Sequence, residues 1–314
     1  MLYSIVIPCY NSSHTISDVV GLIKEEMPKC SITDYEIILV NDCSPDGGET
    51  LEVLRYLAEE NSRIKVIDLA KNAGQHNAVM AGLNYANGDI IIGMDDDMQT
   101  HPSQISILLS ELDKGYDVVY GYYPDKKHSG FRNFGSFINY LSVRILIGKP
   151  KELKTSSYWV IRKYVRDNVI RYKGSYAYMQ GLFLRTTNNI TCVPIKHYER
   201  AYGKSNYNFK KLVKLWSSII GFSIVPLRLS VWIGEIFAAA GIIGAIVILI
   251  RKLLNPAMAM GWPSMMIAIC FFSGINLMFL GLIGEYTGRI FMGMNNQPQY
   301  VVKEVIEEGN KNKS

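Results

Sequence analysis

The N-terminal half of the chain alternates short apolar runs with longer segments in which apolar residues recur every three or four positions. The short runs predict strands, and the longer segments predict amphipathic helices. The expected strands lie at residues 4–7, 36–40, 64–67, 89–92 and 118–120, and the expected helices at residues 17–27, 50–60 and 75–86. Strands that alternate with helices are typical of an α/β fold in which a mainly parallel sheet is covered on both faces.

A polar or glycine-containing cluster follows each of the first four expected strands. These clusters are Pro8–Asn11, Asn41-Asp42, Lys71–Gly74 and Asp95–Asp97. Because ligands of open parallel sheets bind outside the carboxyl ends of the strands, we expect the clusters to converge on one site. The chain lacks GxGxxG after its first strand and lacks GxxxxGK[ST] throughout. Its sequence therefore argues against a conventional dinucleotide fold and against a P-loop hydrolase.

Three consecutive carboxylates, Asp95, Asp96 and Asp97, follow the apolar run at residues 90–92. Carboxylates this close repel one another and do not all stay ionised unless a cation lies among them. A hard divalent cation prefers oxygen ligands and commonly bridges to substrate phosphates. The pattern favours a metal-bound phosphate substrate over the alternative, a solvated acidic turn.

Two apolar stretches near the C-terminus predict transmembrane helices. They are residues 232–250 and, within the charge-free stretch 253–284, the part from Pro263 onward. Each supplies the roughly 20 apolar residues that a bilayer crossing requires. The short connection at Pro256 predicts an antiparallel hairpin. The alternative is a pair of buried helices in a soluble domain.

Two further segments, residues 131–147 and 212–229, are rich in apolar and aromatic residues and predict helices that lie in the membrane interface. Ordinary amphipathic core helices are the alternative. Basic residues before the first predicted span, with Arg289 after the second, place both ends in the cytoplasm, whereas Arg251 and Lys252 on the other side weaken this orientation.

Bulk composition adds two constraints. The net charge of +5 gives no electrostatic reason to expect a nucleic-acid partner. The five cysteines are odd in number and show no metal-ligand spacing. We expect them to be reduced, which is consistent with a cytosolic catalytic domain.

Seven motifs occur in order along nearly the whole chain. They are residues 4–11 (SIVIPCYN), 40–44 (VNDCS), 72–74 (NAG), 95–99 (DDDMQ), 200–205 (RAYGKS), 226–229 (PLRL) and 284–290 (GEYTGRI). This set resembles the family 2 glycosyltransferases with a GT-A fold. Within that family it is similar to enzymes that load a sugar onto a polyprenyl phosphate, the dolichyl-phosphate mannose synthase-like and bacterial undecaprenyl-phosphate glycosyltransferases.

The resemblance implies a donor site and a metal site. The residues implied to bind the donor nucleotide are Pro8, Tyr10, Asn11, Asp42, Lys71, Gly74 and Asp96. Among them, Asp42 is expected to contact the base, and Asp96 faces either the ribose or the acceptor. Asp95 and Asp97 match the DxD positions and count as catalytic, and together with Gln99 they are expected to hold Mg²⁺ or Mn²⁺ on the donor diphosphate.

The resemblance also implies an acceptor site. Arg200, which also counts as catalytic, and Lys204 and Ser205 are expected to guide the acceptor phosphate. A membrane-facing basic patch is the alternative role. Some relatives carry a carboxylate, the proposed base, in the segment that corresponds to residues 155–159, and this chain has none there. A phosphate monoester is already largely ionised at pH 7, so it can attack without a dedicated base.

We therefore expect a GT-A, Rossmann-like catalytic core at residues 1–130, acceptor-site and interface helices at 131–229, two transmembrane helices at 230–290 and a cytoplasmic tail at 291–314. The expected reaction is inverting transfer from a nucleotide sugar, with UDP favoured over GDP, to undecaprenyl or polyprenyl phosphate, and the sugar stays open. The enzyme is expected to be a multi-pass protein of the inner (plasma) membrane with a cytoplasmic catalytic domain. By resemblance it forms a homo-tetramer.

Two other functions compete with this one. A processive polysaccharide synthase is disfavoured because the chain lacks a QxxRW motif: Gln180 is followed by Gly181, Leu182 and Phe183. A non-catalytic membrane module is disfavoured because such a protein has no chemical reason to keep the costly cluster of carboxylates at residues 95–97.

Overall fold

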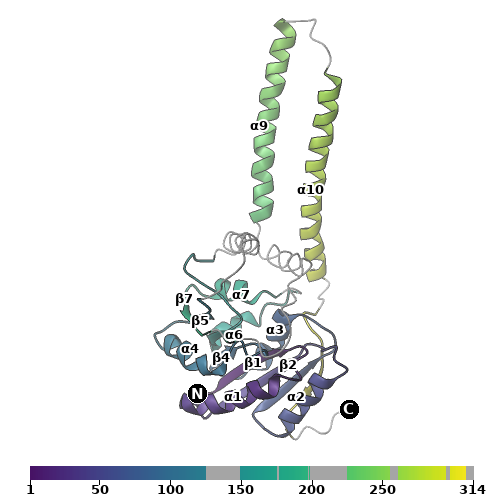
Figure 1. Ribbon diagram of the computed structural model, residues 1–314. Helices are drawn as coiled ribbons and strands as arrows, with labels where there is room; N and C mark the ends of the chain where they lie inside the picture. The colour runs from purple at the N-terminus through teal and green to yellow at the C-terminus, as the bar shows by residue number, and fades with distance from the viewer. Residues whose placement is uncertain are drawn as a thin grey trace.

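In the part of the chain that the structure describes, one mixed sheet of eight strands has the order β7-β5-β6-β4-β1-β2-β3-β8 (Figure 1). The computed structural model describes residues 1–124, 149–174, 177–196, 198, 225–254, 261–294 and 298–308. The strands are β1 (Tyr3–Cys9), β2 (Tyr35–Asn41), β3 (Ile64–Leu69), β4 (Ile90–Gly93), β5 (Val118–Tyr122), β6 (Trp159–Arg162), β7 (Ile190–Pro194) and β8 (Val302–Ile306).

The centre of the sheet is parallel. β1 pairs with β2 and with β4, and β2 pairs with β3, all in parallel register. Their carboxyl ends therefore lie along one edge of the sheet, which is the arrangement that the alternation of strands and helices predicts. β6 and β8 instead pair antiparallel with β4 and β3, so the complete sheet is mixed.

Helices cover both faces of the sheet. Among the described residues, the helices of this domain are α1 (Ile16–Lys29), α2 (Glu49–Glu59), α3 (Gln75–Tyr85), α4 (Ile105–Leu112), α6 (Lys163–Val169) and α7 (Met179–Thr186), with a 3₁₀ turn at Pro102–Gln104. Successive strand residues point to opposite faces. Accordingly, Ile5 and Ile7 pack with α1, α2 and α4 in one buried core, whereas Val6 packs with α3, α6 and α7 in the other.

The sheet extends past residue 130, the predicted end of the catalytic core. β6 and β7 come from the segment assigned to acceptor-site helices, and β8 comes from the segment assigned to a tail. The physical reason is pairing: β3 and β4 would otherwise expose unpaired backbone groups along their edges, and the later strands satisfy these groups. An ion pair between Arg55 of α2 and Glu304 of β8 adds to the attachment of the C-terminal strand.

Two long helices, α9 (Val225–Leu254) and α10 (Trp262–Met294), rise side by side from the α/β domain (Figure 1). Within the residues that the structure describes, no helix combines the length and the apolar character that a membrane crossing requires. The predicted transmembrane hairpin and the multi-pass topology are therefore not supported there. The predicted interface helix at 131–147 lies outside the described residues, and of the one at 212–229 only residues 225–229 are described, as the start of α9.

Candidate functional site

The loops that follow β1 and β4 are joined by the second carboxylate of the acidic run. Asp96 accepts a hydrogen bond from the backbone N–H of Tyr10 at 3.1 Å and another from the hydroxyl of Ser12. The backbone N–H of Asn11 donates to Ser44 Oγ at 3.1 Å, which joins the same loop to the one after β2. Asp96 thus positions the loop that carries Tyr10. The sequence alone does not identify these partners of Asp96.

The loop after β3 is held by Asp42 at the end of β2. The Asp42 carboxylate accepts hydrogen bonds from the backbone N–H groups of Ala73, at 2.6 Å, and Gly74, at 2.9 Å. Asn72 Nδ2 donates to the Asp42 carbonyl oxygen at 3.2 Å. Asp42 is buried, whereas Lys71 of the same loop is exposed. The predicted contact of Asp42 with the base stays a prediction.

The loops at this edge have unusual backbone conformations. Asn11, Cys43 and Met98 have φ values of +57°, +51° and +65°, and Gly74 has φ +87° with ψ 153°. Positive φ is uncommon for residues other than glycine and clusters at functional sites. These loops follow β1, β2, β4 and β3. The hydrogen bonds described above join them to one another, so the four expected clusters do converge.

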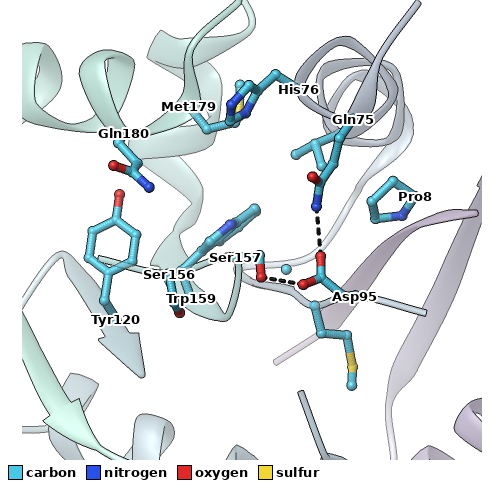
Figure 2. Close-up of a pocket in the computed structure, with 13 residues that line it drawn as sticks. Pro8, Gln75, His76, Asp95, Tyr120, Ser156, Ser157, Trp159, Met179 and Gln180 are labelled. Atoms are coloured by element: carbon cyan, nitrogen blue, oxygen red, sulfur yellow. Dashed lines mark hydrogen bonds between the residues drawn. The ribbon is translucent and has the colours of Figure 1, made fainter. Parts of the chain in front are cut away.

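The first carboxylate of the acidic run is held by two side chains from elsewhere in the sequence. Asp95 Oδ1 accepts a hydrogen bond from Gln75 Nε2 at 2.7 Å, and Oδ2 accepts one from the Ser157 hydroxyl (Figure 2). Burial, reinforced by the neighbouring charges of Asp97 and Asp96, raises the pKa of Asp95 to about 7. Because this pKa is near 7, the Asp95 carboxyl is only partly ionised at neutral pH.

The oxygen ligands available around the acidic run are of the kind that a hard cation prefers. Asp95, Asp97 and Gln99 bring carboxylate and amide oxygens, which Mg²⁺ and Mn²⁺ prefer. In the present arrangement Asp97 Oδ1 accepts from the backbone N–H of Gln99 at 3.1 Å. No group of three or more His, Cys, Asp or Glu side chains among the described residues is arranged to hold a metal ion.

A cavity of about 170 Å³ lies beside Asp95 (Figure 2). Pro8 and Asp95 are the predicted site residues that line it. The lining residues that sequence reasoning did not assign to a site include Gln75, His76, Tyr120, Ser157, Trp159 and Gln180. Gln75 directly follows the 72–74 motif, which is a signal for its position; Tyr120 and Gln180 carry no comparable signal.

Burial affects the protonation of His76 in this cavity. It lowers the pKa of His76 to about 4, so this imidazole is neutral at pH 7. Asp95 is the only carboxylate in the cavity wall, and no lysine or arginine lines it among the described residues. The predicted acceptor residues Arg200, Lys204 and Ser205 lie outside the described residues.

Comparisons with known sequences identify one family. The sequence profile described as glycosyl transferase family 2 matches residues 4–176. The chain is 32% identical over 306 residues to the uncharacterized glycosyltransferase YkcC of Bacillus subtilis (strain 168), covering 96% of this chain and 93% of that protein. It is 30% identical over 312 residues to the undecaprenyl-phosphate 4-deoxy-4-formamido-L-arabinose transferase of Enterobacter sp. (strain 638), covering 98% and 94%.

Among solved structures, the chain is similar to glucosyl-3-phosphoglycerate synthase from Mycobacterium tuberculosis in complex with Mn²⁺, uridine diphosphate and phosphoglyceric acid. The TM-score is 0.52 at 18% identity, over 70% of this chain and 76% of that one. At this identity the likeness concerns the fold alone, and it agrees with the expected GT-A core.

Proposed function

We propose a function for this chain from one established premise: the chain belongs to glycosyl transferase family 2. The proposed reaction is transfer of a sugar from a UDP-sugar to undecaprenyl or a related polyprenyl phosphate, with inversion at the anomeric carbon. The observation that carries the proposal is the convergence of four loops at the carboxyl ends of β1 to β4, where Asp96 holds the Tyr10 loop and Asp42 holds the 73–74 loop.

In this proposal the chain's own residues bind and orient the donor. Tyr10 and Lys71 are exposed at the edge of the sheet, where they are available to the nucleotide, and Pro8, Asn11 and Gly74 bring the backbone close to it. Asp96 and Asp42 act by fixing these loops. The prior ordering of the loops lowers the conformational cost of binding.

Asp95, Asp97 and Gln99 would hold Mg²⁺ or Mn²⁺. Such a cation, when bound, would supply positive charge to neutralise the charge that develops on the leaving nucleoside diphosphate. The Ser157 and Gln75 side chains hold the Asp95 carboxylate in place.

For the acceptor, we propose a lipid phosphate at the cytoplasmic face of the inner (plasma) membrane. The Enterobacter relative is named for an undecaprenyl-phosphate substrate, and the match covers nearly the full length of both chains. Large apolar side chains, among them Trp232 and Leu277, are exposed along α9 and α10, which suits contact with lipid. Arg200, Lys204 and Ser205 are proposed to guide the acceptor phosphate, and the homo-tetramer stays a prediction.

A direct assay tests this function. The full-length protein is incubated with undecaprenyl phosphate, Mn²⁺ and each of several UDP-sugars, and lipid-linked sugar is detected by mass spectrometry. We expect product with at least one donor, and nucleotide release that depends on the lipid. Product formation that is absent with every UDP-sugar but present with GDP-sugars would overturn the nucleotide assignment. Absence with both would overturn the reaction.

A further inference from the structure

The cavity beside Asp95 is lined by residues from elements that are distant in the sequence and meet only in the folded chain. Gln75 and His76 come from α3, Gln180 from α7, Tyr120 from β5 and Trp159 from β6. A Cβ atom on Gly93, a residue of β4, would come within 2.1 Å of the Trp159 ring. The indole therefore packs directly on the β4 backbone, immediately before the acidic run.

Tyr120 presents an unusual polar group to this cavity. Its side chain is fully buried, and its hydroxyl has no hydrogen-bond partner among the described residues. The hydroxyl points toward the side chain of Gln180 (Figure 2). A buried hydroxyl left unpaired costs roughly 1–3 kcal/mol, so an orphan of this kind requires an explanation such as a missing ligand.

Gln180 is oriented by a fixed network. Its Oε1 accepts hydrogen bonds from the Thr155 hydroxyl and from the Tyr178 hydroxyl, each at 2.9 Å. Because only the carbonyl oxygen of a glutamine amide accepts, these two donors define which way the amide points. Lys149 Nζ in turn donates to Thr155 Oγ1 at 2.9 Å. The Nε2 group of Gln180 is thereby left as a donor beside the Tyr120 hydroxyl (Figure 2).

The chemical groups that line the cavity indicate which kind of ligand it can bind. The Tyr120 and Trp159 rings supply apolar surface, and the Tyr120 hydroxyl and Gln180 Nε2 supply hydrogen-bonding groups. The described wall contains no lysine or arginine that could pair with an anionic group, and the cation proposed at Asp95 is already shared with the donor diphosphate. This combination suits an uncharged ring that carries several hydroxyls, and disfavours a phosphate or a carboxylate.

We infer that this cavity receives the sugar ring of the donor, that the ring is uncharged, and that Tyr120 and Gln180 are the specificity-determining residues that hydrogen-bond its hydroxyls. This inference rests on the proposed function, because it requires a UDP-sugar bound at the neighbouring loops. The class of substrate is a nucleotide sugar whose sugar has no carboxylate.

The test compares two tyrosine-to-phenylalanine variants. Tyr120→Phe removes the orphan hydroxyl and leaves the packing in place. Tyr158→Phe is the matched control, because Tyr158 is equally buried, lies outside the cavity wall and donates its hydroxyl to the His101 carbonyl oxygen at 3.1 Å. Calorimetric titration in Mn²⁺ measures the affinities of UDP, UDP-glucose, UDP-galactose, UDP-N-acetylglucosamine and UDP-glucuronate for the full-length proteins.

We expect the wild type to bind at least one of the uncharged UDP-sugars more tightly than UDP, and UDP-glucuronate no more tightly than UDP. The gain from the sugar is the ratio of the affinity for the UDP-sugar to the affinity for UDP. In Tyr120→Phe this gain should fall by about three- to tenfold, as expected for the loss of one hydrogen bond, and the affinity for UDP itself should not change. Tyr158→Phe should keep the full gain and melt at a lower temperature than wild type.

Three results overturn the inference while the proposed function stands: an unchanged gain in Tyr120→Phe, tighter binding of UDP-glucuronate than of UDP, or UDP binding with no gain from any uncharged sugar. The last of these indicates a cavity filled by water. If the wild type binds neither UDP nor any UDP-sugar, the proposed function fails, and the inference fails with it.

Discussion

The carboxylate of Asp42 lies 2.6 Å from the backbone nitrogen of Ala73, and its second oxygen accepts from the next amide along the chain. One buried side chain at the end of β2 therefore determines the conformation of the loop after β3. Hydrogen bonds to a charged acceptor are stronger than those between neutral groups, and a buried partner left unpaired is costly. This contact explains why an aspartate follows the strand even if it never touches a ligand.

Asp42→Asn should weaken both the fold and nucleotide binding. An asparagine offers one acceptor oxygen, so its amide group would oppose one of the two backbone N–H groups. We expect a loss of about 1–3 kcal/mol in the free energy of unfolding, measured in urea, together with a lower affinity for UDP. Asp46→Asn is the matched control, because Asp46 accepts from the Thr50 backbone N–H at 3.0 Å in the loop before α2. The control should lose stability and keep its UDP affinity; equal UDP affinity in both variants would contradict the role of Asp42.

Gly74→Ala should be destabilising although space is available for the new methyl group. No atom lies within 4 Å of the position that a Cβ would occupy, but φ is +87°. With ψ at 153°, this conformation is nearly restricted to glycine, and a cost of about 1–3 kcal/mol is expected. Gly21→Ala in α1 offers the opposite case, since there too no atom lies within 4 Å and φ is not positive.

The control at Gly21 should therefore raise the free energy of unfolding by about 0.5–1 kcal/mol. Thermal or urea unfolding of both variants measures the contrast. A Gly74→Ala protein as stable as wild type would show that the loop relaxes to another conformation.

The second and third carboxylates of the acidic run should differ in what they do. Asp97→Asn removes a proposed metal ligand, so we expect transfer activity to fall at least about 100-fold, as for loss of a group that stabilises transition-state charge. The fold should be unaffected, because the substitution also relieves like-charge repulsion. Asp96→Ala instead removes the contacts to Tyr10 and Ser12, so it should lower stability and UDP affinity even without Mn²⁺. Activity assays with UDP titrations in the presence and absence of Mn²⁺ separate the two; wild-type turnover in Asp97→Asn would remove that residue from the metal site.

The sequence was sufficient to predict which loops meet at the site. The apolar periodicity identifies β1 to β4, and parallel strands end at a common edge, so the clusters at Asp42, Gly74 and Asp95 had to converge. It was not sufficient to predict the side chains that face Asp95 from the later strands. Ser157 lies 62 positions away in the sequence and reaches Asp95 only because β6 pairs antiparallel with β4. Neither periodicity nor motif spacing encodes that non-local pairing.

The same limit applies to the edge of the sheet. Residues 302–306 form β8 against β3 after the chain has passed through two long helices. The polar composition of the C-terminal segment indicates a tail, because its alternation of Val302, Lys303 and Glu304 is too short to specify a strand without its partner.

His76 should make stability depend on pH in a defined window. Burial lowers its pKa to about 4 in the folded state, against about 6.5 in an unfolded chain. The unfolded state therefore binds an additional proton between pH 6.5 and 4, and the contribution of His76 to the free energy of unfolding is lost as the pH falls through this window, by at most about 3 kcal/mol. Among the described residues, the titratable groups around His76 are Asp95 and Tyr120 in the same cavity and Tyr178, whose ring centroid lies 5.3 Å from that of the imidazole.

Asp95 acts in the opposite direction, because its raised pKa makes the folded state the better proton binder between about pH 4 and 7. The measurement is accordingly a difference: the free energies of unfolding of wild type and His76→Gln are compared from pH 7 to pH 4. Glutamine cannot take up the proton, so the variant should lose less stability than wild type over this range, and the two curves should converge or cross. Parallel curves would mean that His76 is protonated in the folded protein as readily as in water, and that the cavity is open to solvent at that position.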